Sequence, residues 1–173
     1  MKKVPFSLGW RRSMRERLPW ENDDGGEAVD LPDDFVYELP RSKDAVGGSR
    51  VGFMVDGFAY YTKNFSLPDS YKGKKILLNL DGAYMNTMIK FNDDNIAMHP
   101  YGYTQTTVDL TERIRFDIPN QLVITTHGTQ PSSRWYSGGI YRSVDLWIGE
   151  SCYLDLRDLF ITTPVIEKEY ASV

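Results

Sequence analysis

The sequence has too few of the residues that build disulfides and metal centres to support either. Its 173 residues include one cysteine, Cys152, and two histidines, His99 and His127. A single cysteine cannot form an internal disulfide, and this set leaves little for a structural zinc site. We therefore expect no disulfide, no metal and no cofactor.

A long apolar run and an excess of charge of one sign are also absent. Residues 1–17 are basic, but the apolar stretch 4–10 contains Pro5, Ser7 and Gly9, whereas a secretory signal needs an apolar core of about 7–15 residues. We predict no signal peptide, no membrane span and a cytoplasmic location. The basic run is more typical of a solvated face than of a phosphate site. The net charge of −4, from 24 acidic and 20 basic residues, gives no reason to propose nucleic acid as a partner.

The sequence lacks a periodic segment of helix length and contains many short strand patterns instead. Aromatics make up 13% of the chain, with 14 glycines and 9 prolines, a composition that favours a β-rich fold with many turns. Strand patterns occupy residues 58–65, 76–80, 84–91, 105–110, 120–126, 144–148 and 153–162. Turn signals separate them, so the pattern predicts an antiparallel β-sandwich.

Two connections between these strands have a specific expected conformation. Asn92 and Asp93 tolerate left-handed backbone geometry, so they predict a tight turn. Residues 110–116 predict a short helical turn, which either Asp109 or Thr111 is able to cap.

Residues 130–142 form an unusual connection between two strand patterns. They contain a proline, three serines, two glycines and three aromatic residues. Loops on β scaffolds often carry binding residues, because the scaffold holds them in place. The alternative is structural: Trp135, Tyr136 and Tyr141 cap one end of the β core, and the glycines serve tight turns.

Three sequence motifs stand out along the chain. Residues 133–142 read Ser-Arg-Trp-Tyr-Ser-Gly-Gly-Ile-Tyr-Arg, residues 81–86 Asp-Gly-Ala-Tyr-Met-Asn, and residues 99–104 His-Pro-Tyr-Gly-Tyr-Thr. These motifs resemble those of glycoside hydrolase family 2, especially its bacterial β-galactosidases. The segments that begin at Phe6, Val29, Phe65 and Tyr71 follow the family in the same order. The resemblance covers only the amino-terminal sugar-binding domain of a much longer enzyme.

The resemblance implies a domain organisation. It implies a jelly-roll-like antiparallel β-sandwich, similar to galactose-binding domains, over residues 1–163. Residues 164–173 are then the first strand of a truncated immunoglobulin-like domain, with Phe6 to Trp10 as a first edge strand and Trp10 buried.

The resemblance also implies a division of labour in the parent enzyme. Retaining glycosidases use two carboxyl groups about 5–5.5 Å apart, and in the family both come from a downstream barrel. We expect no catalytic residue in this chain and no activity from it alone, whereas the parent hydrolyses terminal β-galactosides. Three alternatives stay open: the same domain of a β-glucuronidase, a free-standing carbohydrate-binding module, and a domain that organises oligomer contacts.

The family motifs single out Asp34 as a first candidate for substrate binding. Residues 29–35 resemble a segment that approaches the active site in relatives. Asp34 matches this motif, whereas Asp33 stands where the family has histidine. Neighbours on an extended chain point to opposite faces, and the alternative for Asp33 is a solvated acidic loop.

The remaining candidates for substrate binding are Ser132, Arg134 and Trp135, all in the 130–142 connection. Arginine holds hydroxyl or carboxylate groups with a fixed fork of donors, although Arg134 pairing with an acid of its own domain is an equal alternative. Ser132 stands where relatives carry Asn or Asp, and its shorter reach bears on the preferred sugar. Expected partners are a β-galactoside, the other domains of the parent and a possible second copy of the chain, with no nucleic acid and no membrane.

Overall fold

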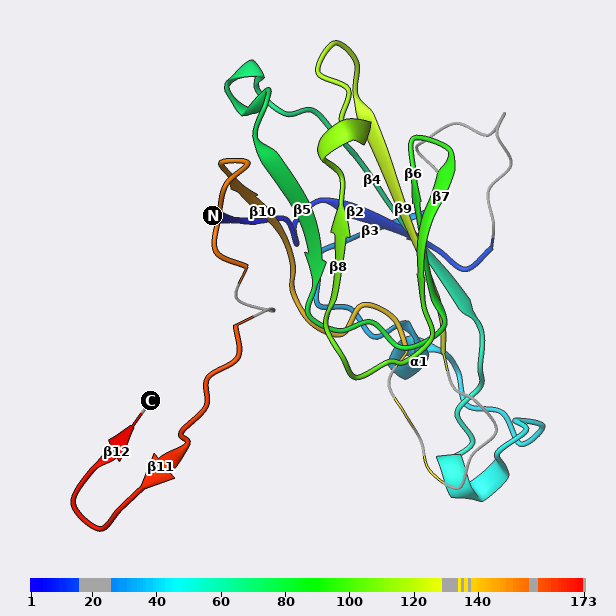
Figure 1. Ribbon diagram of the computed structural model, residues 1–173. Coiled ribbons are helices and arrows are strands. Elements are labelled where there is room, and N and C mark those ends of the chain that lie inside the picture. The colour runs from blue at the N-terminus through cyan, green and yellow to red at the C-terminus, as the bar shows by residue number, and fades with distance from the viewer. Residues whose placement is uncertain (16–25, 129–133, 135, 137, 156–158, 173) are drawn as a thin grey trace.

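The structure is a computed structural model that describes residues 1–15, 26–128, 134, 136, 138–155 and 159–172 (Figure 1). Within these residues two antiparallel sheets pack face to face, which confirms the predicted β-sandwich. The six-stranded sheet has the spatial order β3 (Glu27–Val29), β2 (Trp10–Ser13), β4 (Phe58–Phe65), β9 (Asn120–His127), β6 (Thr87–Phe91) and β7 (Asp94–His99). The four-stranded sheet has the order β1 (Lys2–Pro5), β10 (Val144–Gly149), β5 (Lys75–Leu80) and β8 (Thr106–Asp109). The helical elements are α1 (Phe35–Glu38) and the 3-10 helices η1 (Gly48–Val51), η2 (Asp69–Tyr71) and η3 (Thr111–Arg113).

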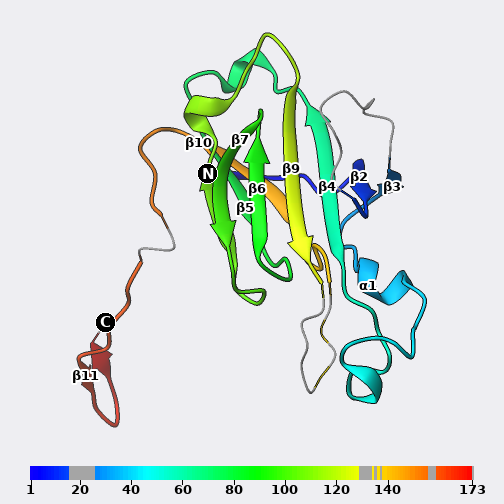
Figure 2. The ribbon, with the colours of Figure 1, turned by 90° about the vertical axis from the view of Figure 1, so that its right-hand side faces the viewer.

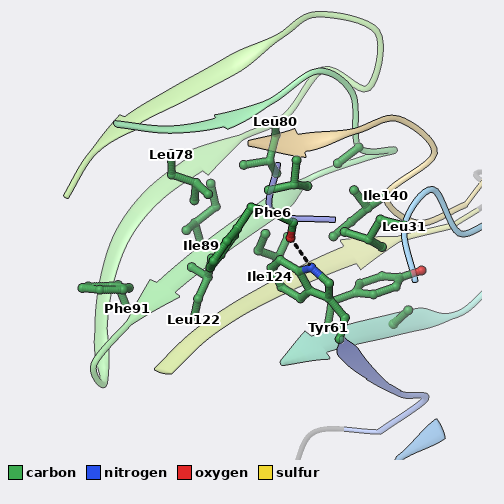
Figure 3. Packing of buried hydrophobic residues seen from close by; sticks show 14 of the residues in the cluster. Phe6, Leu31, Tyr61, Leu78, Leu80, Ile89, Phe91, Leu122, Ile124 and Ile140 are labelled. Atoms are coloured by element: carbon green, nitrogen blue, oxygen red, sulfur yellow. Dashed lines mark hydrogen bonds between the residues drawn. The ribbon is translucent and has the colours of Figure 1, made fainter. Parts of the chain in front are cut away.

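The core lies between the two sheets and follows from the alternation of side chains along each strand. In β6 and β9, every second residue is buried, and Ile89 lies opposite Ile124 in the register of the two strands. Figure 3 shows these side chains facing Leu78 and Leu80 of β5 across the core. Each such side chain contributes about 1.5–3 kcal/mol when it is fully buried, so the two sheets hold each other in place.

The start of the chain differs from the predicted edge strand at residues 6–10. The strands β1 and β2 lie on either side of it, one in each sheet. Residues 6–9 are the crossing between the sheets: the Phe6 amide donates to the Val144 carbonyl at 2.9 Å, and the Ser7 carbonyl accepts from Leu31 at 2.8 Å. The predicted burial of Trp10 is confirmed, and its Nε1–H donates to the Phe6 carbonyl at 2.8 Å.

The left-handed turn predicted at residues 92–93 is confirmed. Asn92 and Asp93 have φ values of 47° and 74°, the geometry that the turn between β6 and β7 requires. The helical turn predicted at 110–116 is present as the shorter η3, but its N-cap residue is Leu110 and no side chain caps it. The Asp109 carboxylate accepts from the Thr111 amide at 2.9 Å instead. The strand predicted at 84–91 begins only at Thr87, because Tyr84 pairs with Gly139 in an isolated bridge and Asn86 has a φ of 49°.

The prediction of a strand at residues 153–162 is wrong for the described part of that stretch, 153–155 and 159–162, where the chain is irregular. The apolar side chains that suggested a strand, such as Leu154 and Phe160, are largely exposed. Without a neighbouring strand, the backbone has no ladder to join, so β propensity alone does not make a strand.

The end of the chain forms a small hairpin of its own. In it β11 (Val165–Ile166) pairs with β12 (Ala171–Ser172), where the sequence predicted one strand over 164–173. Figure 1 shows this hairpin apart from the two sheets. The domain boundary at residue 163 stays a prediction.

The sandwich has two different ends, visible in Figures 1 and 2. We call the end with α1 the loop end; it is formed by α1 and the segments 30–34, 81–86, 100–105 and 138–143. The turn end lies opposite and holds η2, η3 and the turn at 92–93. No helix in the described residues has the length and hydrophobicity needed to cross a membrane.

Candidate functional site

At the loop end, residues 138–140 are bound on both sides by segments that are distant in sequence. Their carbonyl groups accept from the amides of Asp33, Phe35 and Tyr84 at 2.8, 3.1 and 2.9 Å. The Gly139 amide donates back to the Tyr84 carbonyl at 3.1 Å. The end of the 130–142 connection is therefore a fixed part of the fold.

Gly139 is required at the centre of this arrangement. Its φ of +111° is unfavourable for residues with a side chain. A Cβ atom at this position would lie 2.4 Å from the Tyr61 hydroxyl oxygen and 2.7 Å from the Asp33 carbonyl oxygen. The backbone of the connection thus lies directly against Tyr61 and Asp33.

Next to this contact lies a group of charged and polar side chains, which we call the Arg12 cluster: Arg12, Asp33, Tyr61, Glu27 and Glu38. Arg12, Asp33 and Tyr61 are buried, whereas Glu27 and Glu38 are exposed. Arg12 donates to both carboxylate oxygens of Asp33, at 2.9 and 3.0 Å, and the Tyr61 hydroxyl donates to Oδ2 of Asp33 at 2.5 Å. Arg12 also binds Glu27 at 2.6 Å and Glu38 at 2.5 Å. The exposed fractions of the Arg12 and Asp33 side chains are 7% and 9%. Arg12 is therefore an exception to the solvated basic face predicted for residues 1–17, and Asp33 does not lie in a solvated loop.

The cluster keeps its donors protonated. Burial disfavours the charged form of Arg12, but the hydrogen bonds that it donates to Glu38 and Glu27 and the charge of Asp33 outweigh this effect and raise the pKa of the guanidinium. Burial raises the pKa of Tyr61, and the hydrogen bond and charge of Asp33 raise it further. Across the neutral range, Arg12 remains a cation and the Tyr61 phenol remains a donor to Asp33.

Asp34 points away from Asp33, as expected for neighbours on an extended chain. Its Oδ1 accepts from the Gly138 amide at 3.0 Å and from the Tyr37 amide at 3.4 Å. Asp34 is the N-cap residue of α1, and such a carboxylate satisfies amides that the helix leaves without a partner. The structure thus brings Asp34 against the end of the 130–142 connection, and its role in substrate binding stays a prediction.

The other three predicted site residues are only partly within the described chain. Ser132 and Trp135 lie outside the described residues. Arg134 is exposed. Tyr136 is half-buried and stacks on Tyr84 with a centroid distance of 5.5 Å and an interplanar angle of 18°.

Five tyrosines form a group at the loop end, of which only Tyr136 and Tyr141 were singled out from the sequence. It comprises Tyr84, Tyr101, Tyr103, Tyr136 and Tyr141, with Tyr103 at its centre. The ring of Tyr103 lies 5.4 Å from Tyr84 and 5.8 Å from Tyr101, between centroids. Tyr101 and Tyr103 remain 58% and 45% exposed. The signal was present in the sequence, because these tyrosines come from the three family motifs, but only the fold brings them together.

The tyrosine group is anchored as well as exposed. The Tyr141 hydroxyl donates to the Gly102 carbonyl at 2.7 Å. Burial, followed by the neighbouring phenols, raises the pKa of Tyr84 and Tyr103. Tyrosine offers an apolar ring face together with a hydroxyl group, which suits contacts with a sugar ring or with another protein surface. Within the described residues, no group of three or more His, Cys, Asp or Glu side chains is arranged to hold a metal ion.

Two curated proteins are similar to the chain over most of its length. A β-galactosidase of Bacteroides ovatus is 32% identical over 174 residues, which cover 96% of this chain and 20% of the relative. A putative β-glucuronidase of Formosa agariphila is 31% identical over 153 residues, which cover 88% of this chain and 15% of that protein. The chain therefore spans about a fifth or less of the length of these relatives.

Solved structures agree with these matches. A glycosyl hydrolase family 2 member from Bacteroides cellulosilyticus superimposes with a TM-score of 0.85 at 28% identity, over 95% of this chain and 23% of that one. A β-glucuronidase of Bacteroides uniformis gives a TM-score of 0.84 at 25% identity, over 98% of this chain and 21% of that one. No family model matches the sequence.

The two-sheet fold and these relatives define a β-sandwich domain of a glycoside hydrolase. The chain belongs to glycoside hydrolase family 2 and corresponds to the amino-terminal domain of its members.

Proposed function

We propose that this domain packs on the catalytic barrel of a β-galactosidase-like hydrolase and contributes loop-end residues to the rim of the sugar pocket. The parent enzyme hydrolyses terminal β-galactosides by a retaining mechanism, with its acid/base and nucleophile carboxyl groups on the barrel. The observation that supports this proposal best is the 32% identity to a β-galactosidase across 96% of the chain, of which the chain spans only 20%.

The loop end supplies suitable chemistry for this role. Both hydrogen bonds that Asp34 accepts from the described residues go to Oδ1, so Oδ2 is the oxygen left for a sugar hydroxyl. Arg134 is exposed, and its planar fork of donors suits vicinal hydroxyls or a carboxylate of the barrel. Ser132 and Trp135 are the further candidates from the same connection.

Two other functions have an observation in their favour. The similarity to a putative β-glucuronidase and to the solved structure of a β-glucuronidase favours a parent that takes glucuronides. The exposed rings of Tyr101 and Tyr103 favour a carbohydrate-binding module that acts on its own, because such rings are able to stack on sugar faces.

The deciding experiment is the substitution Arg134→Ala in a longer hydrolase that carries this domain. A site role predicts a fall in kcat/KM of at least about ten-fold, or about 1.4 kcal/mol of transition-state binding, with little change in Tm. Arg113→Ala is the matched control, since Arg113 is an exposed arginine of η3 at the turn end, and we expect it to leave the kinetics unchanged. Nitrophenyl β-galactoside and β-glucuronide compared side by side separate the two parent activities.

The chain by itself provides the second arm of this experiment. Residues 1–173 are expected to release no nitrophenol from either substrate, because two suitably spaced carboxyl groups are needed for turnover. Unchanged kinetics in Arg134→Ala would remove the proposed contact with the sugar pocket. The free-standing module would be favoured by two results together. The isolated chain would bind galactose in a calorimetric titration, and longer proteins that carry this domain would hydrolyse neither nitrophenyl glycoside.

A further inference from the structure

The Arg12 cluster joins elements that are far apart in the sequence. Arg12 on β2 lies directly opposite Tyr61 on β4 in the strand register, and both side chains face the inside of the sandwich. Between them they occupy the two oxygens of Asp33 with three hydrogen bonds. Asp33 belongs to the segment between β3 and α1, so the cluster fixes that segment to the six-stranded sheet.

The burial of the cluster restricts Asp33 to one orientation. The side chains of Arg12 and Asp33 are more than nine-tenths buried, and Tyr61 is fully buried. A buried carboxylate without its donors is strongly unfavourable, so rotation of Asp33 away from Arg12 and Tyr61 is costly. Buried ion pairs are poor sources of net stability. The main consequence of this cluster is therefore the fixed orientation of Asp33.

The fixed orientation of Asp33 also fixes the position of Asp34, through backbone contacts with residues 138–140. Its amide donates to the Ile140 carbonyl at 2.8 Å, and its carbonyl oxygen lies against Gly139. The next residue, Asp34, then receives the Gly138 amide on Oδ1 at 3.0 Å. The buried side chain of Asp33 thus sets the position of its half-buried neighbour Asp34.

We propose that Arg12, Asp33 and Tyr61 form a positioning unit that holds the Asp34 carboxylate, through the backbone of residues 33–34 and 138–140, in the orientation that leaves Oδ2 for a sugar hydroxyl. The three residues of the unit do not touch the ligand. They act through Asp34, and this inference rests on the function proposed above for the loop end.

The first test uses residues 1–173 and two conservative substitutions. Tyr61→Phe removes a single hydroxyl group, and Asp33→Asn keeps the shape of the side chain but removes its charge. In both variants we expect hydrogen exchange at the Gly138 and Gly139 amides, followed by NMR, to become at least about ten-fold faster, because local opening becomes easier. Amides of β9 at the turn end keep their rates.

The matched control is Tyr71→Phe, which removes a tyrosine hydroxyl from η2 at the turn end. We expect it to leave the exchange rates unchanged, both at Gly138 and Gly139 and at the β9 amides. Equal exchange at Gly138 and Gly139 in the wild type, Tyr61→Phe and Asp33→Asn overturns the positioning unit, and a melting curve for each variant confirms that it is folded.

The second test separates a positioning role from a purely structural one in the longer hydrolase. Asp34→Asn retains the N-cap, since Asn caps as well as Asp, and we expect it to lower kcat/KM at least about ten-fold. Asp33→Asn is expected to lower kcat/KM in the wild type but to have no further effect in the Asp34→Asn background, because both changes act on one contact.

The possible results of the kinetic test are distinct. Additive losses from the two substitutions overturn the inference, because they show that Asp33 does not act through Asp34. A loss in Asp34→Asn with none in Asp33→Asn also overturns it, although the proposed function then stands. Unchanged kinetics in Asp34→Asn overturn the ligand contact of Asp34 in the proposed function, and the inference with it.

Discussion

The two ends of the sandwich bury polar side chains in different ways. At the turn end, the neutral side chain of Asn120 is fully buried: it accepts from the Arg115 amide and from the Asn92 side chain, both at 2.9 Å, and donates to the Arg115 carbonyl at 2.7 Å. At the loop end, the buried group is charged: Arg12 pairs with the buried Asp33 and also with the exposed carboxylates of Glu27 and Glu38.

This difference shows how each end is held. The Asn120 amide closes neighbouring turns, and its partner Arg115 is only five residues away. The loop end depends on long-range contacts, such as that between Asp34 and Gly138, which are 104 residues apart. The neutral Asn120 side chain stabilises its turn through partners that lie close in the sequence. The charged Arg12 cluster is favourable only while the distant segments that carry Arg12, Asp33 and Tyr61 are all in place.

The largest effect is expected from breaking the charged cluster. Asp33→Ala removes the only buried partner among the three carboxylates that pair with Arg12 and leaves it with the exposed Glu27 and Glu38. Loss of one member of a buried ion pair costs about 3–5 kcal/mol. Urea denaturation measures this as a fall in the free energy of unfolding. The control Asp44→Ala, at an exposed aspartate of the segment between α1 and η1, is expected to change stability by less than about 0.5 kcal/mol.

The second effect compares a glycine at each end. Both Gly139 and Gly73 have positive φ, +111° and +75°, but a Cβ at Gly73 has open space around it. We expect Gly73→Ala to lower the free energy of unfolding by about 1–2 kcal/mol because of backbone strain. Gly139→Ala is expected to cost about 1–3 kcal/mol more, because the added methyl group overpacks against Tyr61 and Asp33. Equal losses in the two variants would show that the loop end relaxes around the added methyl group.

The third effect concerns the neutral group at the turn end. Asn120→Ala removes a fully buried side chain and leaves the part-buried carbonyl and amide of Arg115 without that partner, which we expect to cost about 1–3 kcal/mol. We expect hydrogen exchange at Gly138 and Gly139 to stay unchanged in this variant. The comparison between the two ends fails if Asn120→Ala destabilises the chain more than Asp33→Ala does.

The smallest effect is expected from an exposed ion pair near the turn end, between Lys75 and Asp109. Burial acts to raise the pKa of Asp109, but hydrogen bonds from Lys75 and Thr111 outweigh it and lower the pKa. The hydrogen bond to Asp109 raises the pKa of Lys75. The pair therefore contributes stability above the unfolded aspartate pKa of about 3.9 and below the unfolded lysine pKa of about 10.4.

This contribution is lost on either side of that window. It disappears as the pH falls through the lowered pKa of Asp109, and again as the pH rises through the raised pKa of Lys75. We expect Asp109→Asn to be less stable than the wild type at pH 7, by a smaller amount than Asp33→Ala, Gly139→Ala or Asn120→Ala. This difference is expected to shrink below about pH 4. Urea denaturation at both pH values measures it, and a difference that is independent of pH would contradict the assignment.

The regular strands were predictable because their signal is local. Residues 58–65 form β4 as expected, since alternating apolar and polar residues match the period of a half-buried strand. The irregular parts were not predictable in this way. The family resemblance implied an edge strand at Phe6 to Trp10, but residues 6–9 cross between the sheets. Residues 153–162 have apolar side chains but, where described, no neighbouring strand.

The candidate site was predictable only in part. Asp34 was identified from its place in a family motif, whereas Arg12 was assigned to a solvated basic face and Tyr61 to an ordinary strand. A basic residue in a basic run carries no sign of burial in the sequence. The tyrosine group was missed for a related reason, because its members lie in three separate motifs.

The sequence by itself determined the class of fold and the family, because hydrophobic alternation and ordered motifs are properties of the chain read from one end to the other. The tertiary structure alone decided that Arg12 and Tyr61 face the core side by side and that Asp33 lies between them. The physical reason is strand register: a shift of one residue turns every side chain of a strand to the opposite face. Register is fixed by the packing of the whole sandwich, and so are the partners of its buried charges.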